Sequence, residues 1–200
     1  MNIWTATARD AGKLSVFNGT IGQWTHAADM AIDLFNTMAK HYKIGISMGA
    51  EKDEDAANIV VKVAGGTESY TFSNQQVNLT VPQGVVHGKT HTFSVEKGPI
   101  EKAIIFVPAS TQTQAGFIHG KTQYQDLSAE GRAGLIVHEF IHAAGLDDNK
   151  DHDMVGGLFY PSLQIVNGKL RESSSDKSPL MPPVRLEGAS LGQLKQLWSK

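Results

Sequence analysis

The hydrophobic spacing of this chain changes from helical to strand-like along its first half, which limits it to folds that combine helices with a sheet. Residues 22–43 place apolar side chains on one helical face: Trp24, Ala28, Ile32, Phe35 and Ala39. The next apolar segments are short and rich in β-branched and aromatic residues, and they predict five strands: 44–48, 58–63, 69–72, 90–95 and 103–107. We therefore expect an α+β fold with a long helix backing a sheet.

The second half predicts two further helices separated by irregular chain. Ser128 can cap a helix that continues through Leu135 and Phe140 and ends at Gly145. The stretch before it, 108–125, is polar and glycine-bearing, and we predict no element there. From 146 to 183 the chain turns irregular, and a short amphipathic helix over 189–199 follows. A loop that long in a compact domain is uncommon unless it serves function or contains small elements of its own, which makes it a candidate cleft wall.

Length and composition restrict the function further. A chain of 200 residues favours one domain, here 1–200, with an upper lobe over 1–145 and a lower lobe over 146–200. The formal charge of −2, without a run of Lys and Arg, argues against nucleic acid as a partner. The absence of cysteine removes disulfides and thiolate ligands. No signal peptide and no membrane span is visible, so the sequence leaves the compartment open.

One helical turn carries the residues that point to chemistry. His138 and His142 are four residues apart, so a helix presents both imidazoles on one face with Glu139 beside them. Imidazoles suit zinc, and a catalytic zinc site has three protein ligands and leaves one position for water. Glu139 can take the proton of that metal-activated water and protonate the leaving amine. The pattern predicts a site for one Zn²⁺, although a helix can also match it by chance.

The residues around this turn resemble the metzincin branch of the zincin metallopeptidases. HEFIHAAGLDD at 138–148 is similar to the family pattern HExxHxxGxx(H/D), with Gly145 at the bend, and SPLMPP at 178–183 resembles the Met-turn, with Met181 beneath the metal. The resemblance implies a zinc-dependent endopeptidase with a twisted, mostly parallel sheet, a backing helix, an active-site helix, a small irregular C-terminal lobe and a terminal helix. It also implies a peptide or protein substrate that pairs with an edge strand.

The third zinc ligand is left open among three residues. Asp148 falls at the family's register, whereas His152 is the more usual ligand type for zinc, and Glu187 is a downstream carboxylate. We favour His152. Tyr160 is a candidate donor to the oxyanion, although packing against the lower lobe is the plainer explanation for it.

The remaining resemblances and motifs add less. The compact chain without a visible signal is similar to metallopeptidase effector domains of bacterial secretion systems and phages, which implies export by a non-Sec route and an immunity or inhibitor protein as a partner. The tetrapeptide HGKT occurs at 87–90 and 119–122. Neither copy has the first glycine that a phosphate-binding loop requires, so we interpret the repeat as coincidence in two turns.

Two alternative functions remain open at this level. A domain that keeps zinc only for stability would close the site with four ligands and perform no catalysis. A metallohydrolase that cuts another kind of bond would use the same metal and the same base. Glu139 argues against the first alternative, because a structural zinc site does not need it.

Overall fold

The structure is a computed structural model, and it describes residues 3–83, 87–94, 96, 98–118, 121–146, 163–166, 169–172, 186 and 188–199. Four helices occur in these residues: α1 (Ala6–Ala11), α2 (Gln23–Tyr42), α3 (Ala129–Ala143) and α4 (Gly188–Trp198). The strands of the main sheet are β1 (Lys13–Asn18), β2 (Ser47–Glu51), β3 (Ile59–Ala64), β6 (Lys89–Ser94) and β7 (Ile100–Pro108). The other strands form hairpins: β4 (Thr67–Phe72) with β5 (Gln75–Thr80), β8 (Gln112–Ile118) with β9 (Lys121–Asp126), and β10 (Leu163–Val166) with β11 (Lys169–Glu172).

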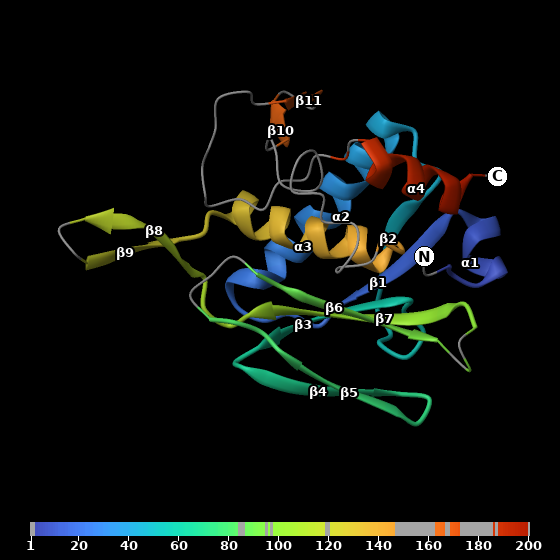
Figure 1. Ribbon diagram of the computed structural model, residues 1–200, viewed down its shortest axis with the longest axis horizontal. Coiled ribbons are helices and arrows are strands. Elements are labelled where there is room, and N and C mark those ends of the chain that lie inside the picture. The colour runs from blue at the N-terminus through green and yellow to red at the C-terminus, as the bar shows by residue number, and fades with distance from the viewer. Residues whose placement is uncertain are drawn as a thin grey trace.

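The five strands of the main sheet lie in the order β2-β1-β3-β7-β6. The β1–β2, β1–β3 and β3–β7 pairs are parallel, and β6 runs antiparallel to β7 at one edge. The expected α+β fold with a twisted, mixed sheet is therefore confirmed. In Figure 1, α2, α3 and α4 lie on one face of this sheet and the β4–β5 hairpin lies on the other.

The long helix α2 confirms the helical spacing seen in the sequence. Its five predicted core positions, Trp24, Ala28, Ile32, Phe35 and Ala39, are all buried. The helix packs against α3, where the Phe35 and Phe140 rings meet edge to face with their centroids 6.0 Å apart. The backing helix and the HExxH helix thus share one core layer above the sheet.

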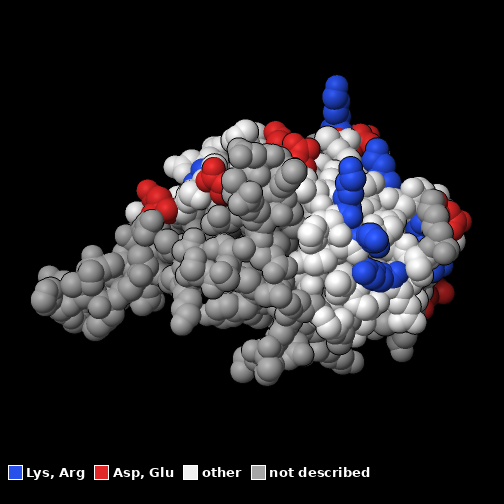
Figure 2. Space-filling view, turned by 90° about the horizontal axis from the view of Figure 1, so that it is seen from above, with Lys and Arg blue, Asp and Glu red and all other residues white. Residues whose placement is uncertain are grey.

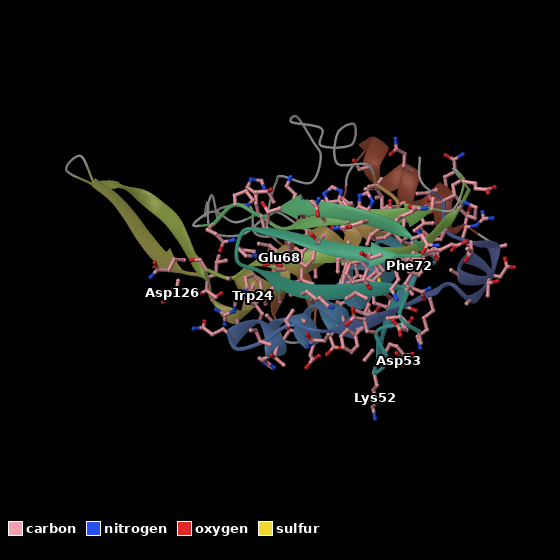
Figure 3. All side chains as sticks on the ribbon, turned by 90° about the horizontal axis from the view of Figure 1, so that it is seen from below. Trp24, Lys52, Asp53, Glu68, Phe72 and Asp126 are labelled. Atoms are coloured by element: carbon pink, nitrogen blue, oxygen red, sulfur yellow. The ribbon has the colours of Figure 1, made fainter. Side chains whose placement is uncertain are left out.

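A smaller apolar cluster covers the opposite face of the sheet. Tyr70 and Phe72 of β4 contact Phe93 of β6, with ring centroids 5.9 and 5.8 Å apart. Figure 3 shows this face, with the β4–β5 hairpin lying over the main sheet. The predicted strand at 69–72 is therefore real, but it pairs with β5 in a separate two-stranded sheet.

Several elements of the fold were missed in the sequence analysis. The opening segment, for which no element was predicted, contains α1 and the interior strand β1, and the polar stretch at 108–125 contains most of the β8–β9 hairpin. That hairpin projects from the body of the protein in Figure 1. Its two strands pair with each other, so a polar sequence is enough to form it. The segment 146–183, expected to be irregular unless it held small elements of its own, contains such an element in the β10–β11 hairpin.

The boundary of the first predicted strand was also wrong. Ile44 and Ile46 are buried but precede β2, because Lys43 adopts a left-handed conformation and Ile44 N–H donates to the Ala39 carbonyl at 2.8 Å to close α2. The helices predicted at Ser128 and at 189–199 are confirmed as α3 and α4 within one or two residues.

The helices end at one side of the molecule. Trp198, the last residue of α4, places its carbonyl where any side chain on Gly45 would collide with it.

Basic residues lie in the last turns of three helices, where a cation interacts favourably with the helix dipole: Arg9 in α1, Lys40 in α2 and Lys195 in α4. Figure 2 shows several Lys and Arg side chains over the part of the viewed face that carries α4. No helix among the described residues is long and apolar enough to span a membrane.

Asn36 joins α2 to the outer strand β2, and we expect its loss to destabilise the fold. Its amide donates to the Met48 carbonyl at 2.9 Å and accepts from Met48 N–H at 2.7 Å, so it acts as a strand partner at the edge of the sheet. Asn36→Ala should lower the free energy of unfolding by about 1–3 kcal/mol, because two backbone groups lose their partner. Denaturant unfolding would measure this, with exposed Asp33→Ala as the control. Equal stability of the two variants would contradict it.

Candidate metal centre

Helix α3 begins at the cap that the sequence predicts. The Ser128 hydroxyl accepts a hydrogen bond from Gly131 N–H at 3.0 Å. A hydrogen bond from its own backbone N–H, together with one from Ser128, holds the pKa of the Glu130 carboxyl below its usual value. Nearly every later residue of α3 is buried, including Leu135, Ile136 and Phe140. The helix is therefore a fixed element that packs against both the sheet and α2.

The three residues of the HExxH turn lie together in this buried helix. His138, Glu139 and His142 are 8%, 4% and 4% exposed, which is unusual for side chains that can carry charge. The two imidazole rings have their centroids 4.7 Å apart and are inclined at 77°. The predicted juxtaposition of the two histidines is therefore present in the structure.

The two imidazoles converge through the same nitrogen atom of each ring. His138 Nε2 and His142 Nε2 are 3.1 Å apart. Two nitrogens that bind one tetrahedral zinc at about 2.0–2.1 Å would lie about 3.3 Å apart, so the separation fits a shared ion. A single N–H···N hydrogen bond also fits this distance, and it would occupy the same two atoms. The donor set thus suits zinc, which binds neutral imidazole.

The backbone after α3 fixes the protonation of one of these rings. His142 Nδ1 lies 3.2 Å from the Leu146 carbonyl oxygen. Because a carbonyl only accepts, Nδ1 carries the proton in this contact, and the lone pair of the neutral ring is then on Nε2. This arrangement is the usual one for a metal-binding histidine.

A glycine and two tryptophans shape the end of α3. Gly145 has a φ of 118°, which glycine adopts without strain, so the expected bend at this residue is present. The Trp4 indole N–H donates to the Ala143 carbonyl at 2.7 Å, and the Trp198 indole N–H donates to the Ala144 carbonyl at 2.9 Å. Both are buried hydrogen bonds, and they satisfy carbonyls that the helix end leaves without an intrahelical partner.

Strand β6 contacts the carboxylate of Glu139. The Thr90 hydroxyl donates to Glu139 Oε2 at 2.6 Å and lies 3.3 Å from the Glu139 backbone oxygen. A Cβ on Gly88 would be 2.7 Å from both Cγ and Oε1 of Glu139. Gly88 and Thr90 belong to the first HGKT copy, which we had interpreted as a coincidence in a turn. That interpretation was wrong in its placement, since Lys89 and Thr90 begin β6.

The other predicted site residues lie outside the described residues. These are the candidate ligands Asp148, His152 and Glu187, the Met-turn residue Met181, and Tyr160. Among the residues that the structure describes, no group of three or more His, Cys, Asp or Glu side chains is arranged to hold a metal ion. The described part of the centre therefore consists of two imidazoles and the adjacent carboxylate.

Comparison with known proteins found no match among family models or curated proteins. The functional interpretation therefore depends on the sequence pattern and on the geometry of α3 and β6.

Proposed function

We propose that this chain is a zinc-dependent peptidase of the zincin type, with Glu139 as its general base and acid. One observation carries the proposal: two buried imidazoles on adjacent turns of α3 direct their Nε2 atoms to within 3.1 Å of each other beside a carboxylate that a neighbouring strand orients. The distance fits a shared ion as well as a direct hydrogen bond, and the carboxylate beside the two rings is the group that a catalytic site requires. The bend at Gly145 supports the same interpretation.

His138 and His142 would hold the zinc ion through Nε2, and His152 is our proposed third ligand, with Asp148 and Glu187 as the alternatives. Zinc in such a site lowers the pKa of a coordinated water to about 7 and polarises a carbonyl. The Leu146 carbonyl keeps His142 in the tautomer that offers Nε2. In the same proposal Met181 would lie beneath the metal.

Glu139 would move the proton in this reaction. Its carboxylate would take a proton from the attacking water and return it to the leaving amine. Its burial excludes bulk water from the group that transfers the proton. Tyr160 is a proposed donor to the developing oxyanion.

Strand β6 offers a place for the substrate. It is the last strand of the main sheet, antiparallel to β7, and it lies against α3. An extended peptide could add to its edge by backbone hydrogen bonds, next to Glu139. A peptide or protein substrate is therefore favoured over other hydrolysable molecules.

Metal removal tests the proposal. We expect the purified protein to contain one zinc ion and to hydrolyse an unstructured protein such as casein. A zinc chelator should abolish hydrolysis, and zinc should restore it, because the ion activates the water and the carbonyl. Magnesium, which prefers oxygen ligands, is the control and should not restore it. Full hydrolysis by metal-free protein would contradict the proposal, and bound zinc without hydrolysis would favour a zinc-stabilised domain.

A further inference from the structure

We propose that Gly88, which immediately precedes the edge strand β6, and Thr90 within that strand are positioning residues that hold the Glu139 carboxylate in its working orientation. This inference depends on the proposed function, because it concerns the same general base. It assigns a role to two residues of the first HGKT copy, at 87–90, for which the sequence analysis found no function. The residues act through Glu139 and need not touch substrate.

The Thr90 hydroxyl provides the directional contact. Its oxygen lies 2.6 Å from Glu139 Oε2, within the range of about 2.5–2.7 Å that is typical of a hydroxyl hydrogen bond to a charged carboxylate. The backbone oxygen of Glu139 is further away, at 3.3 Å. A hydroxyl has one hydrogen, so the shorter contact takes it. Rotation of the carboxylate about its last bond would break this hydrogen bond.

Gly88 provides the space for the carboxylate. A Cβ on Gly88 would lie 2.7 Å from Cγ, 2.7 Å from Oε1 and 2.8 Å from Cδ of Glu139, closer than real side chains approach. The glycine is buried, so an added methyl group could not be turned toward solvent. The backbone just before β6 can therefore lie against the carboxylate only because residue 88 has no side chain. Thr90 and Gly88 together hold the group from its Oε2 side and its Oε1 side.

The orientation of a general base affects the rate more than the stability. A displacement of about 1 Å in a reacting group can reduce turnover by about 100-fold, and loss of a partner that orients an active-site residue typically costs about 10- to 100-fold. Substrate binding by the strand edge uses backbone groups, which a change at the Thr90 side chain leaves in place. A positioning role therefore predicts a lower kcat with an unchanged KM.

Three variants of strand β6 test the role of Thr90. Thr90→Val keeps the shape and removes the hydroxyl, and it should lower kcat about 10- to 100-fold with KM and zinc content unchanged. Thr90→Ser keeps the hydroxyl and should retain most of the activity. Thr92→Val makes the same change two residues along, on the same face of the strand, and should behave like the wild type. The proposal is overturned if Thr90→Val stays within twofold of Thr92→Val, or if the serine variant loses as much as the valine variant.

Gly88→Ala and a structural measurement complete the test. Gly88→Ala should also lower kcat at least about tenfold, and crystal structures of metal-free wild type and variants should show the Glu139 carboxylate displaced in Thr90→Val and Gly88→Ala but not in Thr92→Val. An unmoved carboxylate in both variants would overturn the inference. If the wild type hydrolyses no peptide, the proposed function fails, whereas the position of the carboxylate still decides whether these residues hold Glu139.

Discussion

Glu139→Gln should lower kcat for casein by about 100- to 10,000-fold while the protein keeps its fold and its zinc. This range is the usual contribution of a positioned general acid or base. Glutamine has nearly the same shape and can still accept a hydrogen bond from the Thr90 hydroxyl at its amide oxygen, so the packing between α3 and β6 should persist. It cannot take a proton from water at neutral pH, and the loss should therefore appear in turnover.

A matched control for this variant lies in the same helix. Glu130 is exposed in the first turn of α3, and Glu130→Gln removes a carboxylate at a distance from the two histidines. We expect normal turnover and a small loss of stability, because a negative charge at a helix N-terminus is favourable by about 0.3–1 kcal/mol. Steady-state kinetics and zinc content of both variants would be compared. Wild-type turnover in Glu139→Gln would end the proposed mechanism.

Substitution of either histidine of the turn should remove the zinc. His138→Ala and His142→Ala each delete one of the two converging Nε2 atoms, and the remaining imidazole is a much poorer chelator. Zinc at 100 times its dissociation constant stabilises a folded protein by about 2.7 kcal/mol, which corresponds to roughly 5–10 °C in Tm for a chain of this size. The wild type should show this rise on addition of zinc, and the two variants should not.

The zinc content of purified variants identifies the third ligand. We expect His152→Ala to lose zinc, and Asp148→Ala and Glu187→Ala to keep it; zinc loss in one of the latter would reassign the ligand. His41→Ala is the control, because His41 is exposed in the last turn of α2 and should not affect the metal. Metal analysis of each purified variant gives the answer, and an anomalous signal beside His138 in a crystal would locate the ion. Undiminished zinc binding in His142→Ala would contradict the centre as we describe it.

The parts of the fold that the sequence predicts are those with local signals. The spacing of apolar residues identified α2, and a cap and a bend glycine bounded α3, because the helix period and its termini depend on neighbours within four residues. Strand β1 was missed, since only Leu14 and Val16 alternate with polar residues in a short segment. The β8–β9 and β10–β11 hairpins were missed because strands that pair mainly with each other need little apolar sequence.

The candidate site divides in the same way. His138, Glu139 and His142 are adjacent on one helix, so their spacing revealed them. Thr90 is 49 residues from Glu139, and its hydrogen bond arises from the packing of β6 against α3. The only available signal was the repeated HGKT, and the last two residues of its second copy, Lys121 and Thr122, begin β9, which projects away from α3 in Figure 1. Contacts between distant segments such as this one become visible only in three dimensions.

The indole contacts at the end of α3 link the two ends of the chain to the histidines. Trp4 and Trp198, two of the chain's three tryptophans, are bound to the carbonyls of Ala143 and Ala144, directly after His142. Linked equilibria are reciprocal, so detachment of either terminal segment would weaken the grip of this turn on a ligand, and a bound ligand would hold both segments in place. Unfolding of either terminal segment and ligand binding at His138 and His142 would then be coupled.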